Sequence, residues 1–128
     1  MRLDMLTLFP AMFSGPFGDS IIKRAVDSGI LDIHCTNFRD FAAGKHHQVD
    51  DSPFGGGSGM VLKPEPLFLA VRHILATTDH AKRRILLMDP GGSVFTQAKA
   101  KELTAYEQLI FICGHYEGYD ARIKTLAD

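Results

Sequence analysis

Short apolar segments alternate along this chain with segments of helical periodicity, and this alternation constrains the fold more than any other feature of the sequence. We predict strands at residues 3–9, 30–38, 84–89 and 108–113. The last two are almost continuously apolar, which is typical of strands that are covered on both faces. Strands that alternate with helices form βαβ units with right-handed crossovers, so the sequence predicts an α/β fold with a largely parallel sheet.

Four helices are expected between or after these strands, at residues 19–28, 64–75, 96–106 and 119–126. Asp19 or Ser20 can cap the first helix and Thr96 the third, because their side-chain oxygens accept hydrogen bonds from free backbone N–H groups. Pro64 or Pro66 opens the second helix, since proline fits the first helical turn.

The composition is that of an ordinary globular domain: 45% of the 128 residues are hydrophobic and 23% are charged, with a formal net charge of -1. No apolar run approaches the ~20 residues that cross a bilayer, and the first residues lack a signal-peptide pattern. The two cysteines are too few for a disulfide framework and fit a reducing compartment. We therefore expect one domain over residues 1–128, in the cytoplasm and without a membrane segment.

Two of the predicted strand exits are rich in glycine, and ligands in open α/β sheets bind outside the carboxyl ends of the strands. Asp-Pro-Gly-Gly occupies residues 89–92 after the third strand, and residues 114–118 follow the fourth. Glycine lets the backbone approach a ligand and present its N–H and C=O groups. Such loops can hold an adenosine, with Tyr116 or Leu87 against the base. The alternative interpretation is that both loops are ordinary turns.

The segment of residues 39–59 has no regular pattern, and irregular segments of this length are usually functional or mobile. It contains clustered imidazoles and carboxylates followed by a glycine-rich stretch. No lysine follows Gly59, so a P-loop is excluded, and Ser58 precedes Met60 where a nucleophile elbow needs glycine. We expect an arm that closes over a bound substrate; a solvated surface loop is the alternative.

Metal binding is conceivable at four residues of this segment, His46, His47, Asp50 and Asp51. The HExxH and CxxC spacings of common metal sites are absent, so we expect no metal held by the protein. A metal-dependent phosphoesterase that uses these four residues remains an alternative function. Cys35 and Cys113 lie in apolar segments and are predicted to be inert core residues.

Several motifs occur together and in order along the whole chain. They are LTLFP near the start, RDF at 39–41, HxxVDD at 46–51, GGGSGM at 55–60, DPGG at 89–92 and ICGHYEGYDAR at 112–122. Because it contains this ordered set of motifs, the chain resembles the bacterial tRNA guanine-N(1) methyltransferases of the TrmD family. The resemblance implies a SPOUT methyltransferase fold with a trefoil knot, an obligate homodimer, and methyl transfer from S-adenosylmethionine to N1 of guanine at position 37 of tRNA.

The resemblance also assigns site residues by their positions in the motifs. Those matching the cofactor loops are Leu87, Met88, Pro90, Gly92, Gly114, Tyr116, Glu117 and Gly118. Glu117 is in addition given a supporting catalytic role toward the substrate. His46, Asp50 and Gly59 match positions that recognise the tRNA and its target guanine.

Family members continue beyond the point that matches Asp128, through the rest of the knot, a linker with the proposed general base and a helical tRNA-binding domain. We therefore expect residues 1–128 to be a truncated N-terminal cofactor-binding domain that is inactive alone. The alternative is a non-catalytic module that only dimerises or binds tRNA.

Overall fold

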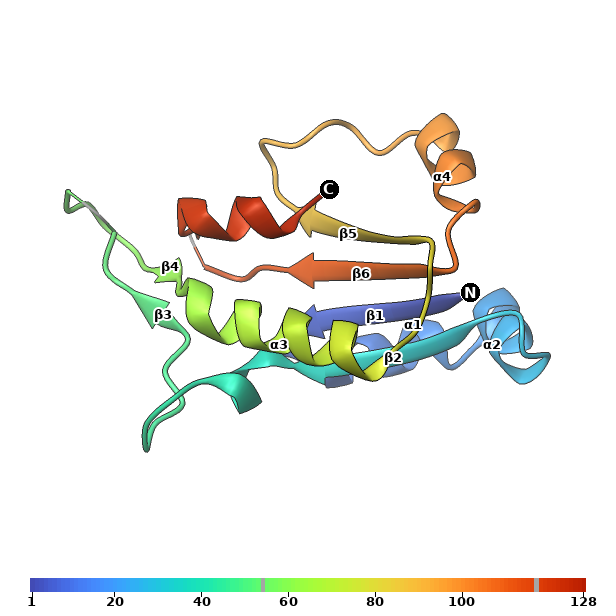
Figure 1. Cartoon of the computed structure of the whole chain (residues 1–128), viewed down its shortest axis with the longest axis horizontal. Helices are drawn as coiled ribbons and strands as arrows, with labels where there is room; N and C mark the ends of the chain where they lie inside the picture. Colours follow the sequence, from blue (N-terminus) through green and yellow to red (C-terminus); the bar gives the residue numbers. More distant parts are fainter. Residues whose placement is uncertain (54, 117) are drawn as a thin grey trace.

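The computed structural model describes residues 1–53, 55–116 and 118–128, and it is built around a four-stranded sheet (Figure 1). The strands are β1 (Arg2–Thr7), β2 (Asp32–Asn37), β5 (Arg83–Met88) and β6 (Gln108–Cys113). Their order in the sheet is β2-β1-β6-β5, and every neighbouring pair is parallel. The predicted α/β fold with a parallel sheet is confirmed. The strand predicted at 108–113 has the observed bounds, and the other three differ from the observed strands only at their ends. The trefoil knot stays a prediction.

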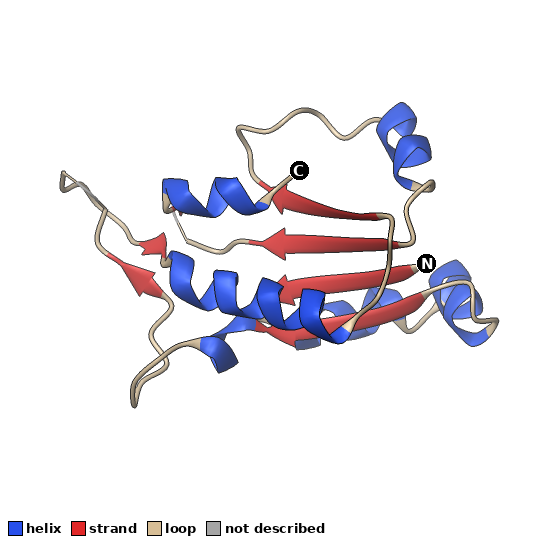
Figure 2. Cartoon of the chain, in the orientation of Figure 1, coloured by secondary structure: helices blue, strands red, loops and turns tan. Residues whose placement is uncertain are grey.

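One face of the sheet is covered by α3 (Pro64–Thr77) and by the 3₁₀-helix η3 (Ala121–Leu126), as Figure 2 shows. Leu6, Ile110 and Ile112 from the two central strands are fully buried against α3 residues such as Leu67 and Val71. This cluster is the core of the domain. The remaining helical segments are η1 (Pro10–Phe13), α1 (Ser14–Phe17), α2 (Ser20–Asp27), η2 (Phe38–Phe41) and α4 (Gln97–Leu103).

The predicted helix caps are in place. The Asp19 side chain accepts a hydrogen bond from the Ser20 N–H at the start of α2, and Thr96 Oγ1 accepts one from the Lys99 N–H at the start of α4. Pro64 is the first residue of α3. Two side-chain caps and one first-turn proline therefore locate three helix starts.

The helix predicted at residues 119–126 is wrong at its start and in its type. Tyr119 belongs instead to a short strand, β7 (Gly118–Tyr119), and the 3₁₀-helix η3 follows it. The reason is tertiary, because β7 pairs with β4 (Val61–Leu62) in a second sheet of order β3-β4-β7.

The segment predicted to be irregular, residues 39–59, is also partly regular. It begins within η2 and includes β3 (Asp50–Asp51), which pairs antiparallel with β4. Val49 is fully buried beside β3, and its carbonyl accepts a hydrogen bond of 2.7 Å from the Lys63 N–H. The middle of the arm, which we define as residues 44–59, is therefore paired with β4, and its last residue lies close to the start of that strand. Figure 1 shows the arm projecting beyond the carboxyl ends of the large sheet.

Two burial predictions are corrected by the positions of the edge strands. Cys35 is exposed rather than part of the core, because β2 is at one edge of the sheet, and Cys113 in the interior strand β6 is partly buried. β6 is covered as predicted, whereas β5 at the opposite edge leaves Met88 50% exposed.

Within the described residues, no helix has the length and apolar character needed to cross a membrane.

Candidate functional site

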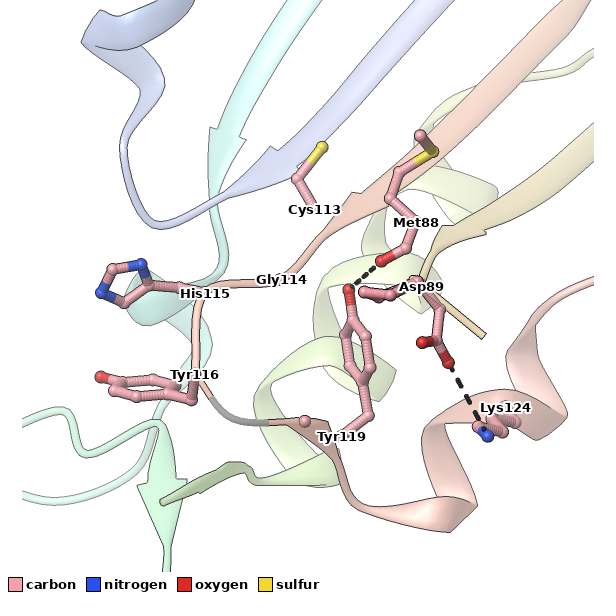
Figure 3. Close-up of a pocket in the computed structure, with 10 residues that line it drawn as sticks. Met88, Asp89, Cys113, Gly114, His115, Tyr116, Tyr119 and Lys124 are labelled. Carbon is pink, nitrogen blue, oxygen red and sulfur yellow. Dashed lines mark hydrogen bonds and ion pairs between the residues drawn. The ribbon is translucent and has the colours of Figure 1, made fainter. Parts of the chain in front are cut away.

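A cleft with a volume of about 630 Å³ lies where β5 and β6 end, at the carboxyl edge of the large sheet (Figure 3). Its lining comes from the two strand exits and from the segment that follows them: Met88, Asp89, Pro90, Cys113, Gly114, His115, Tyr116, Gly118, Tyr119 and Lys124. This is the edge at which parallel α/β sheets bind ligands.

The loop after β5 is a tight turn organised by Asp89. The Asp89 side chain accepts a hydrogen bond of 3.0 Å from the Gly91 N–H, and its carbonyl accepts one of 2.9 Å from the Gly92 N–H. The Lys124 ammonium of η3 lies 3.7 Å from the Asp89 carboxylate. The turn is therefore held both by its own backbone and by the last helical segment.

The loop after β6 starts at Gly114, and the side chain of Tyr119 packs against it. A Cβ atom at position 114 would lie 2.6 Å from Tyr119 Cζ, so only glycine fits there while the ring keeps this position. The Tyr119 hydroxyl donates a hydrogen bond of 2.7 Å to the Met88 carbonyl at the end of β5. Burial raises the pKa of Tyr119 to about 12, so the hydroxyl remains a donor at neutral pH.

Aromatic rings form the other side of the β6 exit. The His115 ring lies 4.8 Å from the Phe9 ring and 5.1 Å from the Tyr116 ring, both in edge-on contacts. Tyr116 is partly buried against the core. Figure 3 shows the His115 and Tyr116 rings on the side of the loop away from Met88 and Asp89.

The structure brings together five of the residues predicted to bind a cofactor. Those that line the cleft are Met88, Pro90, Gly114, Tyr116 and Gly118. Leu87 and Gly92 instead line a neighbouring groove along β5, which shares Met88 and Asp89 with the cleft. Leu87 is also packed against the core. Glu117 lies outside the described residues.

The predicted substrate residues are on the arm and outside the lining of this cleft. His46 and Gly59 are exposed, and Asp50 lies in β3. The small sheet connects this region to the cleft, because Val61 and Leu62 of β4 pair with Gly118 and Tyr119 of β7. The arm and the second cleft loop therefore share one hydrogen-bonded unit.

In the part of the chain that the structure describes, no group of three or more His, Cys, Asp or Glu side chains is placed to hold a metal ion. His46, His47, Asp50 and Asp51 are close in sequence without forming such a group. The phosphoesterase alternative needs these four residues to converge, and it therefore gains no support.

Tyr119 and Lys124 line the cleft without having been predicted to do so. Tyr119 is joined to a strand residue 31 positions earlier, so no local pattern marks it. Lys124 reaches Asp89 from η3, which was expected as an ordinary helix. The one available signal is the glycine at position 114, which indicates a close approach without saying by which side chain.

Asp120 caps η3 beside the cleft. Its carboxylate accepts a hydrogen bond of 2.9 Å from the Arg122 backbone N–H and pairs with the Arg122 guanidinium at 2.7 Å. The guanidinium hydrogen bond, followed by the backbone one, lowers the pKa of Asp120 from 3.8 to about 2. A carboxyl group whose pKa is lowered by folding stabilises the fold above its unfolded pKa, and this contribution is lost as the pH falls through the folded pKa.

Replacement Asp120→Asn keeps a capping oxygen and removes the charge. We expect it to lower the free energy of unfolding at neutral pH by less than about 1 kcal/mol, since exposed ion pairs contribute little. The difference from the wild type should disappear as the pH falls from about 4 to about 2. Urea unfolding of both proteins across this range is the measurement. A difference that persists at the lowest pH would show that the charge of Asp120 is not its source.

The comparisons with known proteins all match the same family of proteins, over nearly the whole length of this chain. A family model described as tRNA (Guanine-1)-methyltransferase TrmD matches residues 1–128. Similar proteins named tRNA (guanine-N(1)-)-methyltransferase include one from Dehalococcoides mccartyi (strain CBDB1), 55% identical over 124 residues that make up 97% of this chain and 50% of the relative. Another, from Enterococcus faecalis, is 50% identical over 126 residues, or 98% of this chain and 51% of the relative.

Among solved structures, the crystal structure of tRNA (m1G37) methyltransferase from Aquifex aeolicus is similar, with a TM-score of 0.89 and 36% sequence identity. The match covers 100% of this chain and 57% of that one. The chain thus spans about half the length of the curated relatives that it matches.

Proposed function

The chain belongs to the tRNA (guanine-1)-methyltransferase TrmD family, and from this premise we propose that it forms the S-adenosylmethionine-binding part of an enzyme that methylates N1 of guanine 37 in tRNA. The observation that carries the proposal is the cleft at the ends of β5 and β6, within a chain that matches the family from residue 1 to 128. A methyltransferase needs a methyl donor, and we assign the donor to this cleft.

The types of residue that line the cleft are suited to binding an adenosyl group. Tight turns after both strands expose backbone groups beside a volume of about 630 Å³, and Gly114 leaves no side chain of its own in the way. Small-molecule sites combine such a concave space with a few convergent polar groups. S-adenosylmethionine supplies an activated methyl group when bound. We propose that Pro90, Gly114 and Gly118 hold it.

The chemistry requires a base as well as a donor. Guanine N1 carries a proton that must leave as the methyl group arrives, so a base within hydrogen-bond reach contributes to the rate. The Asp89 carboxylate in the cleft is occupied by Lys124 and the Gly91 N–H, which fits a role in shaping the turn. We propose that Glu117 supports the substrate and that the base comes from another part of the enzyme.

We further propose that the arm contacts the tRNA through His46, Asp50 and Gly59. The small sheet supports this assignment, because it joins the middle of the arm, through β4, to the β7 residues that line the cleft. Exposed polar groups on such an arm can bind phosphates and base edges.

We also propose that the chain pairs with a second copy of itself and that the enzyme is cytoplasmic. The two free cysteines are compatible with that location.

A chimera tests the proposed function. In it, the matching half of the Dehalococcoides mccartyi relative, 55% identical, is replaced by residues 1–128 of this chain. We expect the chimera to transfer tritiated methyl groups from S-adenosylmethionine to a tRNA transcript with guanine at position 37 and not to one with adenine there. The intact relative is the positive control. A folded chimera that binds tRNA and transfers no methyl group would contradict the proposal.

Residues 1–128 alone are expected to give no methyl transfer above a control without protein. The reason is that the cleft can position a donor, whereas proton removal needs a base that we place elsewhere in the enzyme. The same tritium assay measures this. Turnover by the isolated chain would show that the base lies within it.

Cys113 gives a reporter inside the cleft, and Cys35 gives a matched control outside it. Burial raises the pKa of both thiols, and Cys113 is the less exposed of the two. We expect iodoacetamide to modify Cys35 faster. We also expect S-adenosylhomocysteine to slow the modification of Cys113 several-fold and to leave Cys35 unchanged. Peptide mass spectrometry over time measures both rates, and equal protection of the two cysteines would count against the cleft as the binding site.

A further inference from the structure

We propose that Tyr119 is a positioning residue of the cleft, which fixes the exit of β5 against the loop that follows β6. This inference rests on the proposed function only for the identity of the ligand. The role itself follows from three contacts that Tyr119 makes with different parts of the fold.

The first contact supports the end of an edge strand. β5 is the last strand in the order β2-β1-β6-β5, so β6 is its one neighbour in that sheet. Met88 ends β5 and is 50% exposed. The Tyr119 hydroxyl donates a hydrogen bond of 2.7 Å to the Met88 carbonyl, across 31 positions of sequence (Figure 3). Tyr119 therefore holds the strand end at which the Asp89 turn begins.

The second contact is with the end of β6. The Tyr119 ring lies directly over Gly114, where a Cβ atom would come within 3.1 Å of Tyr119 Cε1 and closer still to Cζ. Cβ atoms in proteins avoid contacts shorter than 3.0 Å, so the absence of a side chain at position 114 is what lets the ring lie there. The strand ends are already paired through Met88 and Cys113, so the ring acts on the residues that follow them: it packs against Gly114 while its hydroxyl holds the exit of β5.

The third contact fixes Tyr119 itself. Its backbone lies in β7, in register with the fully buried Leu62 of β4. The next residue, Asp120, donates its N–H to the Leu62 carbonyl at 3.2 Å. The backbone is anchored on both sides of this side chain. The position of the Tyr119 ring in the cleft is therefore fixed by the small sheet.

The Met88 carbonyl is consequently engaged within the protein. A bound adenosyl group would meet a β5 exit whose last carbonyl already accepts a hydrogen bond, beside a turn that is held in one conformation. A site whose groups are held in place before binding loses less entropy when its ligand arrives. Tyr119 therefore acts on affinity through the two loops.

The test compares Tyr119→Phe with Tyr106→Phe in the 128-residue chain. Both changes remove one hydroxyl, and the Tyr106 hydroxyl accepts a hydrogen bond from Arg84, away from the cleft. Phenylalanine keeps the ring over Gly114, and circular dichroism checks that both variants fold. The readouts are ¹⁵N order parameters of Gly91 and Gly92 without ligand, and the Kd of S-adenosylhomocysteine by calorimetry.

We expect Tyr119→Phe to lower the Gly91 and Gly92 order parameters from the rigid range, about 0.85, toward about 0.6. It should also weaken S-adenosylhomocysteine binding about two- to tenfold, which corresponds to the loss of one hydrogen bond. Tyr106→Phe should change neither quantity.

Order parameters in Tyr119→Phe equal to those of the wild type would overturn the positioning role, whatever the affinity. Changed order parameters with no binding by the wild-type chain would instead leave the role in place and contradict the proposed function. Equal effects of the two substitutions would also overturn the inference, because they would show a general loss of stability.

Discussion

Replacement Gly114→Asp is expected to reduce the affinity of the chain for S-adenosylhomocysteine on the order of 100-fold, which amounts to loss of measurable binding in most titrations. A side chain at this position meets the Tyr119 ring, since the Cβ alone would lie 2.6 Å from Cζ. The ring must move, its hydrogen bond to Met88 breaks, and a carboxylate enters the cleft. Overpacking and the lost bond together cost about 2–4 kcal/mol. Calorimetric titration of the two proteins measures the change.

The control for this experiment is Gly15→Asp. Gly15 lies in α1, and no neighbouring atom lies within 4 Å of a Cβ placed there. We expect this variant to bind as the wild type does. If Gly114→Asp folds and retains the wild-type affinity, the cleft between β5 and β6 is not the binding site.

Replacement Asp4→Ala is expected to lower the free energy of unfolding by about 3–5 kcal/mol, because it removes one partner of a buried charged network. The Asp4 carboxylate is fully buried in the central strand β1. It accepts hydrogen bonds from Arg2 at 2.8 and 2.9 Å and from the Gln108 side-chain amide at 2.8 Å. Gln108 is itself fully buried, so its amide loses a partner that water cannot easily replace.

Urea unfolding of Asp4→Ala measures the loss, and Asp27→Ala provides the matched control. Asp27 also pairs with a cation, Lys23, and its side chain is 60% exposed. Exposed pairs of this kind contribute about 1 kcal/mol or less. A loss in Asp4→Ala no larger than that in Asp27→Ala would show that the network contributes little to stability.

The large sheet could be predicted from the sequence because its strands are marked locally. Apolar runs bounded by turn residues locate β1, β2, β5 and β6, and the caps Asp19 and Thr96 locate two helices. These signals depend on neighbours within a few residues. Parallel pairing then follows from the alternation of strands and helices, whereas the strand order β2-β1-β6-β5 does not.

The small sheet could not be predicted, because its strands are two residues long and exist through pairing alone. Nothing in the sequence at Gly118–Tyr119 indicates a strand, and β7 forms where Val61–Leu62 lies beside it. The exposure of Cys35 has a similar cause. An apolar segment looks the same whether its strand is central or at the edge, and β2 is at the edge.

The candidate site was predicted as two loops rather than as a set of contacts. Glycine and proline at the strand exits locate Pro90, Gly114 and Gly118 in the cleft. The same reasoning places Leu87 in the cleft as well, whereas the structure turns it toward the core. Alternation of side chains along a strand decides which of two neighbours faces a ligand, and the sequence leaves that alternation open.

Backbone amide shifts recorded while the ¹⁵N-labelled chain is titrated with S-adenosylhomocysteine test the central claim most directly. The cleft at the carboxyl ends of β5 and β6 predicts saturable changes at Asp89, Gly114 and Tyr119. It predicts none at Tyr106 and Glu107, which line a cleft at the other end of the sheet. Saturable changes confined to that other end, or no changes at all, would contradict the assignment of the cofactor to this site.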